Sequence, residues 1–102
     1  MTTTPLHISS ARQADGTTSL LVRGEIDMSN TACLADAIDG APGRLLLDFS
    51  AVEYLDSAGL AVLFAHADRI ELVANRLIDP VLRVSGLTGL VTVHEPPQHT
   101  GT

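Results

Sequence analysis

Lysine and tryptophan are absent from this 102-residue chain, and only 3% of its residues are aromatic. Its six basic residues are therefore all arginine, and they face twelve acidic residues, which gives a formal net charge of -6 at pH 7. A chain of this charge repels the phosphates of nucleic acids and of anionic membrane surfaces. We therefore expect no nucleic-acid partner, no insertion into a membrane, and a protein partner whose contact surface is basic or apolar.

The single cysteine, Cys33, excludes an intramolecular disulfide and is typical of a reducing compartment. Because it lies in an apolar segment with helical spacing, we expect it to pack as a small hydrophobic side chain. Residues 1–5 carry neither the positive charge nor the apolar run of a signal peptide. No apolar run approaches the length of a bilayer-spanning helix. The sequence thus predicts a cytoplasmic protein.

Recognisable catalytic and metal-binding patterns are also missing. The four histidines are scattered, and no two have the spacing of metal ligands. There is no Gly-x-Ser-x-Gly nucleophile elbow, and Gly40-Ala41-Pro42-Gly43 lacks the lysine of a phosphate-binding loop. We expect no catalytic residue, no metal, no cofactor and no enzymatic activity.

Apolar residues make up 45% of the chain, enough for one core built from leucine, valine, isoleucine and alanine. We expect a single domain over residues 1–94. Residues 95–102 include Pro96-Pro97 and lack apolar residues that could pack, so we expect a disordered tail.

The N-terminal half predicts a hairpin, a helix and a buried strand. Strands over residues 6–11 and 19–23 flank an Asp-Gly turn signal. Ser29 is placed to cap a helix to about residue 38, and residues 44–49 resemble a parallel strand buried on both faces, followed by a loop over 50–55. The helix stripe expected to face the core is Leu34, Ala37, Ile38 and Ala41.

The C-terminal half predicts two further helices and two further strands. A helix begins near Ser57, and a short helix starts around Pro80 and ends at Gly86. Residues 70–74 are interpreted as a strand, with a continued helix as the alternative, and residues 91–93 as the last strand. The core-facing stripe expected in the helix after Ser57 is Leu60, Leu63, Phe64 and Ala67.

This order of elements predicts an α/β fold, with a mixed, mostly parallel β-sheet, an N-terminal antiparallel hairpin strand and helices packed on the sheet. Asp56-Ser57 opens one of those helices, so either side chain could be its N-cap. A hydroxyl at this position is exposed and lies at the positive end of the helix dipole, where a phosphate is tolerated well. The pattern fits a switch serine, although capping alone would also explain it.

Three motifs together resemble the STAS domain family. Gly24-Glu25-Ile26-Asp27 resembles the signature at the end of its second strand, and residues 47–60 resemble its central strand, loop and phosphorylation motif. Ser85-Gly86-Leu87 resembles the exit from its third helix. The resemblance extends from about residue 6 to residue 93 and implies the STAS fold.

The resemblance implies a function of the anti-sigma-factor antagonist type, also called an anti-anti-sigma factor. Such a bacterial phosphoprotein binds an anti-sigma factor when unphosphorylated and so regulates transcription. The anti-sigma factor is often a serine kinase with an ATP-binding domain, and a phosphatase restores the active form. Ser57 is the implied acceptor, and Ala58 excludes a second acceptor at the next position. The alternative is a STAS subunit that binds a membrane transport ATPase of the lipid-transport type without a phospho-switch.

The implied partner-binding residues surround the acceptor. Asp56 could support the hydroxyl, bind a metal brought with the kinase's nucleotide, or only cap the helix. Gly59 could allow a partner to approach closely or relieve crowding in the first turn. The expected docking set is Glu25, Asp27, Asp56, Ser57, Ala58 and Gly59.

Two departures from the family pattern affect the expected shape. The helix after Ser57 must be short, because only residues 66–69 separate it from the next strand. The amphipathic helix that often ends the family's chain is missing, so one sheet face is expected to be partly uncovered. We expect that face to favour self-association, such as a homodimer, or partner binding.

Overall fold

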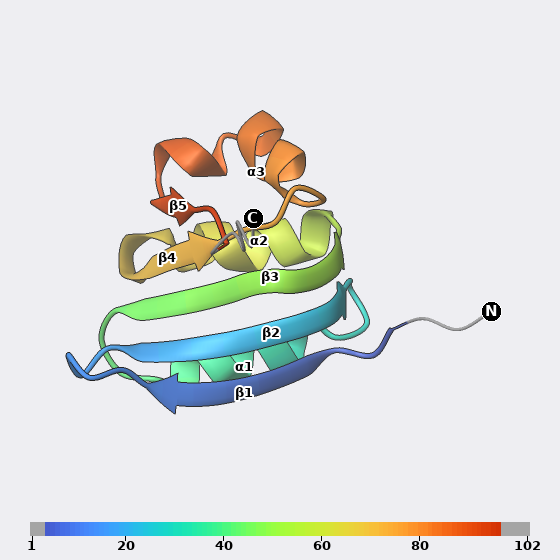
Figure 1. Ribbon diagram of the computed structural model, residues 1–102. Helices are drawn as coiled ribbons and strands as arrows, with labels where there is room; N and C mark the ends of the chain where they lie inside the picture. The colour runs from blue at the N-terminus through green and yellow to red at the C-terminus, as the bar shows by residue number, and fades with distance from the viewer. Residues whose placement is uncertain (1–3, 97–102) are drawn as a thin grey trace, which may run out of the picture.

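The structure is a computed structural model that describes residues 4–96. It contains one five-stranded sheet in which the spatial order of the strands follows the chain order. The first pair is antiparallel and the other three pairs are parallel, which confirms the predicted fold class (Figure 1). The strands are β1 (His7–Arg12), β2 (Thr18–Ile26), β3 (Leu45–Leu55), β4 (Ile70–Val73) and β5 (Val93–His94).

Three α-helices and two short 3₁₀ turns connect these strands. Helices α1 and α2 lie behind the sheet in Figure 1, whereas α3 lies near β5. Within the described residues, no helix is both long enough and apolar enough to cross a membrane. The helical elements are α1 (Thr31–Gly40), α2 (Ser57–Ala65), η1 (Ala67–Arg69), α3 (Asp79–Ser85) and η2 (Leu87–Gly89).

The core is mainly aliphatic, as the composition predicts, and also contains the aromatic ring of Phe49. Alternate residues of β2 and β3 point toward the helices, and they bury Val22, Leu47 and Phe49 completely. Helix α1 contributes Leu34 and Ile38, with the other two members of its expected stripe partly buried. Because successive side chains of a strand point to opposite faces of the sheet, β2 and β3 each have one face in the core and one face toward solvent.

Several sequence-based expectations are wrong. Residues 50–55 are not a loop, because β3 continues to Leu55. The second strand likewise continues past Arg23 to Ile26, through a glycine with a φ of 102°. Burial alternates regularly along β2 to Ile26, whereas in β3 the alternation breaks at Ala51, where the register between the two strands is irregular, and this break hides the end of β3 in the sequence.

Two side chains expected in the core are exposed. Phe64 is 37% exposed, because Gly59 and Leu63 form the buried line of α2. Cys33 is also exposed, one residue away from the buried Leu34. Both errors arise because spacing shows that a stripe exists but does not fix which way the helix is rotated.

The end of the chain differs from the expectation in one detail. The last strand is Val93–His94 and not residues 91–93. Residues 95 and 96 belong to no helix or strand, and the remainder of the expected tail, 97–102, lies outside the described residues. Residues 70–73 form β4, so the continued helix is excluded.

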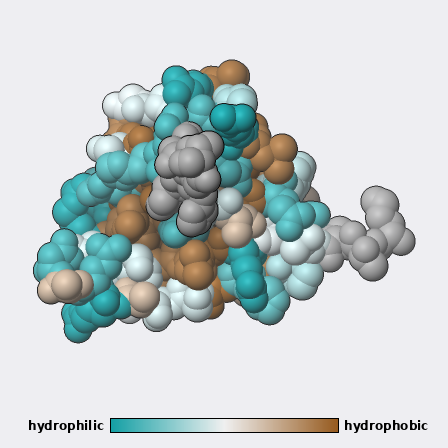
Figure 2. All heavy atoms as spheres, in the orientation of Figure 1, coloured by the Kyte–Doolittle hydropathy of each residue, from teal (hydrophilic) through white to brown (hydrophobic). Residues whose placement is uncertain are grey.

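The sheet face opposite α1 and α2 is partly open. Leu21 is 47% exposed there, and Leu46 and Val73 are half-buried. Figure 2 shows apolar side chains on this face among hydrophilic ones. Asp48 and Ser50 share the same face and hydrogen-bond each other, with 2.6 Å between Oγ and Oδ1. The open face is therefore mixed in polarity and not a continuous apolar patch.

Candidate functional site

The candidate site forms where the carboxyl ends of the parallel strands β2 and β3 meet. The chain leaves β2 into the loop 27–30 and leaves β3 into the start of α2. The backbone N–H of Asp56 donates to the carbonyl of Ile26 over 3.2 Å. Sheet pairing thus brings the Asp27 loop and the Asp56-Ser57 step together, although they are far apart in sequence.

Asp56 caps α2 and holds the neighbouring loop. Its Oδ1 accepts the backbone N–H of Gly59 at 3.0 Å, and its Oδ2 accepts the N–H of Met28 at 3.2 Å. The N-cap is therefore Asp56, and Ser57 is the first residue of the helix. Because both carboxylate oxygens are occupied by backbone donors, Asp56 fixes the geometry of two segments at once.

Ser57 is exposed, whereas the next residue, Ala58, is half-buried. At the first position of a helix, backbone N–H groups point outward and the dipole favours negative charge. A phosphoryl group on the Ser57 hydroxyl would therefore lie in a favourable local field while remaining accessible to a partner.

Gly59 is buried, and it lies against the ends of two strands. A Cβ atom at this position would come within 2.5 Å of Leu55 Cδ1 and 2.8 Å of Ile26 Cγ2. Of the two roles left open by the sequence, the geometry supports the relief of crowding, because the glycine faces the core and not a partner.

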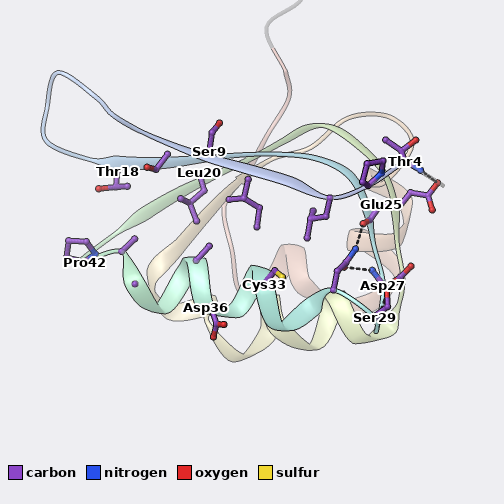
Figure 3. A pocket seen from close by; sticks show the side chains of 18 residues that line it. Thr4, Ser9, Thr18, Leu20, Glu25, Asp27, Ser29, Cys33, Asp36 and Pro42 are labelled. Atoms are coloured by element: carbon purple, nitrogen blue, oxygen red, sulfur yellow. Dashed lines mark hydrogen bonds between the residues drawn. The ribbon is translucent and has the colours of Figure 1, made fainter. Parts of the chain in front are cut away.

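The loop after β2 is fixed by its own polar side chains (Figure 3). Asp27 Oδ1 accepts both the hydroxyl and the backbone N–H of Ser29, at 2.5 and 2.9 Å. The hydrogen bond from the Ser29 hydroxyl, followed by that from its N–H, lowers the pKa of the Asp27 carboxyl. Ser29 therefore does not cap α1 as expected. Asn30 occupies the N-cap position instead.

Asn30 was not among the expected site residues, yet it holds the loop in place. Its Oδ1 accepts the backbone N–H of Asp27 at 3.0 Å, and its Nδ2 donates to the carbonyl of Glu25 at 2.9 Å. An asparagine immediately before an apolar helical stripe is the signal that could have identified it.

The motif predicts that Glu25 docks a partner beside Ser57, but its carboxylate contacts the segment before β1. Its carboxylate Oε2 accepts the backbone N–H of Thr4 at 3.5 Å, and its own N–H donates to the Thr4 carbonyl at 3.2 Å. Glu25 thus anchors the segment that precedes β1. Asp27 and Asp56 are joined more closely, since Asp56 bonds the N–H of the residue after Asp27.

Exposed apolar side chains flank the acidic groups, and sequence reasoning did not single them out. Met28 is 81% exposed in the loop after β2, and Tyr54 is 50% exposed near the end of β3. Alternation along the strands does not single out either residue, because Met28 lies in the loop after β2 and Tyr54 follows the exposed Glu53. The site therefore combines carboxylates, a hydroxyl and apolar contact area.

Metal-binding chemistry finds no support in the part of the chain that is described. Over residues 4–96, no three side chains among histidine, cysteine, aspartate and glutamate gather closely enough to hold an ion. Asp56, the residue for which a metal role was left open, has both oxygens engaged by backbone N–H groups.

Comparison with known sequences identifies a matching family model. The model described as "Mlab, STAS domain" matches residues 9–92, most of the chain. Two curated relatives from Mycobacterium tuberculosis, strains CDC 1551 / Oshkosh and H37Rv, are named anti-sigma-F factor antagonist RsfB. Each is 40% identical over 60 residues, which are 55% of this chain and 49% of the relative. The match thus spans about half the length of these relatives.

Solved structures show the same arrangement. An anti-sigma factor antagonist from Mycobacterium paratuberculosis superposes with a TM-score of 0.80 at 28% identity, covering 88% of this chain and 86% of the other. The anti-sigma factor antagonist SpoIIAA in its unphosphorylated form gives a TM-score of 0.68 at 13% identity, covering 93% and 92%. At that identity the second likeness concerns the fold alone.

Proposed function

This chain belongs to the STAS domain family, and from that premise we propose that it is an anti-sigma-factor antagonist whose binding is switched off by phosphorylation of Ser57. The observation that carries the proposal is an exposed hydroxyl on the first residue of a helix that Asp56 caps and ties to the Asp27 loop. The names of the relatives from Mycobacterium tuberculosis and of the Mycobacterium paratuberculosis structure support the same class of partner.

In the unphosphorylated state, the surface around Ser57 binds the anti-sigma factor and so releases a sigma factor. Met28 supplies exposed apolar area beside Asp56, and Tyr54 adds exposed aromatic area near the end of β3. A partner surface with basic groups around an apolar centre complements this arrangement, because charge steers the encounter and apolar burial provides affinity.

The switch itself is a phosphoryl transfer. The partner's ATP-binding domain transfers the γ-phosphoryl group of ATP to Ser57 Oγ, ADP leaves, and the hydroxyl proton is released. The product carries an additional charge of about -1.5 to -2 at neutral pH. A phosphatase reverses the step by hydrolysis of the phosphoserine. Ala58 offers no hydroxyl, so Ser57 is the one acceptor at this helix start.

Release follows from local electrostatics and needs no change of fold. The helix N-terminus stabilises the phosphate in the free protein. In the complex, that charge must lose water while it lies beside Asp56, so binding weakens by about tenfold for each ~1.4 kcal/mol of cost.

The test begins with capture of the partner by the tagged protein, followed by binding measurements on the purified pair by calorimetry. Ser57→Asp introduces a negative charge, and Ser57→Asn is its neutral control of similar size. We expect Ser57→Ala and Ser57→Asn to bind within about threefold of wild type and Ser57→Asp to bind at least about tenfold more weakly, because only the last variant adds charge.

Equal affinity of Ser57→Asp and Ser57→Asn contradicts the phospho-switch. Thermal unfolding checks that the Asp variant folds, and we expect its midpoint to match or exceed that of the Asn variant, since an acid in the first helical turn is stabilising. Capture of a membrane transport ATPase in place of a sigma regulator contradicts the proposed partner class.

A further inference from the structure

The two outer strands of the sheet are protected very differently. At one edge, β5 contains two residues, and Pro96 follows shortly after it. At the other edge, β1 contains six residues in unbroken antiparallel register with β2, without a bulge and without a proline inside the strand. Long, regular edge strands are normally covered or interrupted, because they offer unpaired backbone groups to another chain.

The hydrogen-bond pattern shows which backbone groups of β1 point away from β2. The N–H of Gln13 donates to the carbonyl of Thr17 at 2.8 Å, so this pair is hydrogen-bonded across the hairpin. In antiparallel strands such pairs alternate with pairs whose N–H and C=O groups point away. Given the register, the residues whose backbone groups point away from β2 are Ile8, Ser10 and Arg12.

The side chains of the same three residues lie on the face that carries α1. Ile8 and Ser10 pair with Val22 and Leu20, which are buried in the core beneath the sheet. Ser9 lies between Ile8 and Ser10 in the strand, and its side chain points to the opposite face, away from α1 (Figure 3). A strand that adds to β1 would therefore place alternate side chains on the α1 side.

A groove is open at this position between β1 and α1 (Figure 3). Its volume is about 910 Å³, and its lining includes apolar side chains of Leu6, Ile8 and Ala37, together with Cys33. The lining also includes Glu25 and Asp27 but no arginine, lysine or histidine, and the carboxylate of Asp36 points away from β1 in Figure 3. An occupant that supplies a cation and a short apolar strand complements it.

We propose that β1 of a second copy of this chain adds antiparallel to β1, so that the sheet continues across a symmetric dimer. With Ser10 opposite Ser10 on the two-fold axis, Ile8 of each copy faces Arg12 of the other. All three outward-facing residues of each strand then pair with outward-facing residues of the partner. Arg12 of each copy then enters the groove of the other copy and supplies the positive charge that the groove lining lacks.

The occupant is a second copy because β1 itself has the required features. It is a short strand with one apolar and one basic side chain on the groove face, and the interface is self-complementary, as two-fold symmetry demands. Both copies carry a net charge of -6, so the assay belongs at about 0.15 M salt, where charges more than roughly 8 Å apart are screened.

The first test is sedimentation equilibrium of the full chain. We expect the mean mass to rise with concentration toward twice the 10.7 kDa of one chain. Ser10→Pro removes an outward N–H without removing a bond to β2, so we expect it to fold and to weaken the dimer at least about tenfold. Ser10→Thr is the matched control, which keeps the N–H and should dimerise like wild type. A wild-type chain that stays monomeric at about 1 mM overturns the proposal.

The second test fixes the register by disulfide trapping in a Cys33→Ser background. A hydrogen-bonded pair on the axis has its Cα atoms about 5.5 Å apart, within the range of a disulfide. We therefore expect Ser10→Cys to cross-link on mild oxidation much faster than Ser9→Cys. Faster cross-linking by Ser9→Cys, or equal rates, overturns the proposed pairing. Neither test uses Ser57, so failure here leaves the proposed phospho-switch to its own experiment.

Discussion

At the scale of single residues, the short segment from Asp56 to Gly59 combines three different roles. Asp56 accepts two backbone N–H groups and Ser57 exposes its hydroxyl, whereas Gly59 is buried against Leu55 and Ile26. The exposed hydroxyl depends on the other two, because the cap and the close helix–strand contact set where α2 begins. In this segment, the residues that maintain the geometry are neighbours of the residue that we propose to be modified.

Gly59→Ala should therefore destabilise the protein. The added methyl group would meet Leu55 Cδ1 and Ile26 Cγ2 inside normal contact distance. We expect a loss of about 1–2 kcal/mol in the free energy of unfolding, since overpacking outweighs the better helix propensity of alanine. Urea unfolding measures this loss. Gly40→Ala is the control, because nothing lies within 4 Å of its Cβ position at the end of α1, and it should be neutral or slightly stabilising. Equal stability of the two variants would contradict the crowding at Gly59.

At the scale of elements, the end of α1 is held by the connection between α2 and β4. Arg69 donates through Nε to the carbonyl of Gly43 at 2.9 Å, and through its terminal nitrogens to the carbonyls of Ile38 and Ala41. The last carbonyls of a helix have no partner within the helix. One guanidinium from a distant segment satisfies this need, which fixes α1 relative to β4.

We predict that Arg69→Ala lowers the free energy of unfolding by about 1–3 kcal/mol, because the partly buried carbonyl of Ala41 loses this donor and that of Ile38 keeps only the N–H of Ala41. Arg44→Ala is the control, because it also removes one arginine charge. Arg44 forms an exposed ion pair with Glu71 at 3.4 Å, so its removal should cost less than about 1 kcal/mol. Chemical unfolding of both variants separates the two cases, and a cost for Arg69→Ala no greater than for Arg44→Ala would contradict the bridging role.

At the scale of the whole molecule, the titratable groups favour a slightly acidic optimum of stability. The hydrogen bond from His94 lowers the pKa of Glu71 most strongly, and the Ser29 hydroxyl does the same for Asp27. His66 shifts in the opposite direction. Its Nδ1 donates to the carbonyl of Val62, which is the main cause of its raised pKa, and its Nε2 lies 2.9 Å from Asp39.

The signs of these shifts set the expected pH profile. Carboxyl groups with lowered pKa stabilise the fold above their unfolded values near 4, and this stabilisation is lost as pH falls through the folded pKa. His66, with a raised pKa, stabilises the fold fully below about pH 6.5, and this contribution is lost as pH rises through its folded pKa.

We predict greatest resistance to urea between about pH 5 and 6.5, a steep loss below about pH 4, and a decline of less than about 1 kcal/mol toward pH 8. Replacement of His66 by glutamine should flatten the alkaline side only. A decline toward pH 8 that persists unchanged in His66→Gln would contradict the assignment to this histidine.

Local chemistry in the sequence determines much of this protein. The apolar run at 44–49 predicts a buried parallel strand, Pro80 and Gly86 delimit α3, and the Asp-Ser step predicts the start of α2. The family-model match over residues 9–92 confirms the STAS resemblance. The sequence could show this resemblance because each of its motifs is a contiguous segment. Each of these features depends on neighbours in the chain.

Only the tertiary structure decided which of those groups act together. It extended β3 to Leu55, chose Asp56 over Ser57 as the cap, and brought Met28 to the Asp56 carboxylate. It also turned Cys33 out of the core and, among residues 4–96, left the outer edge of β1 without a pairing strand. The reason is physical: strand register, helix rotation and the exposure of an edge are set by contacts between segments distant in sequence, and periodicity within one segment carries no information about them.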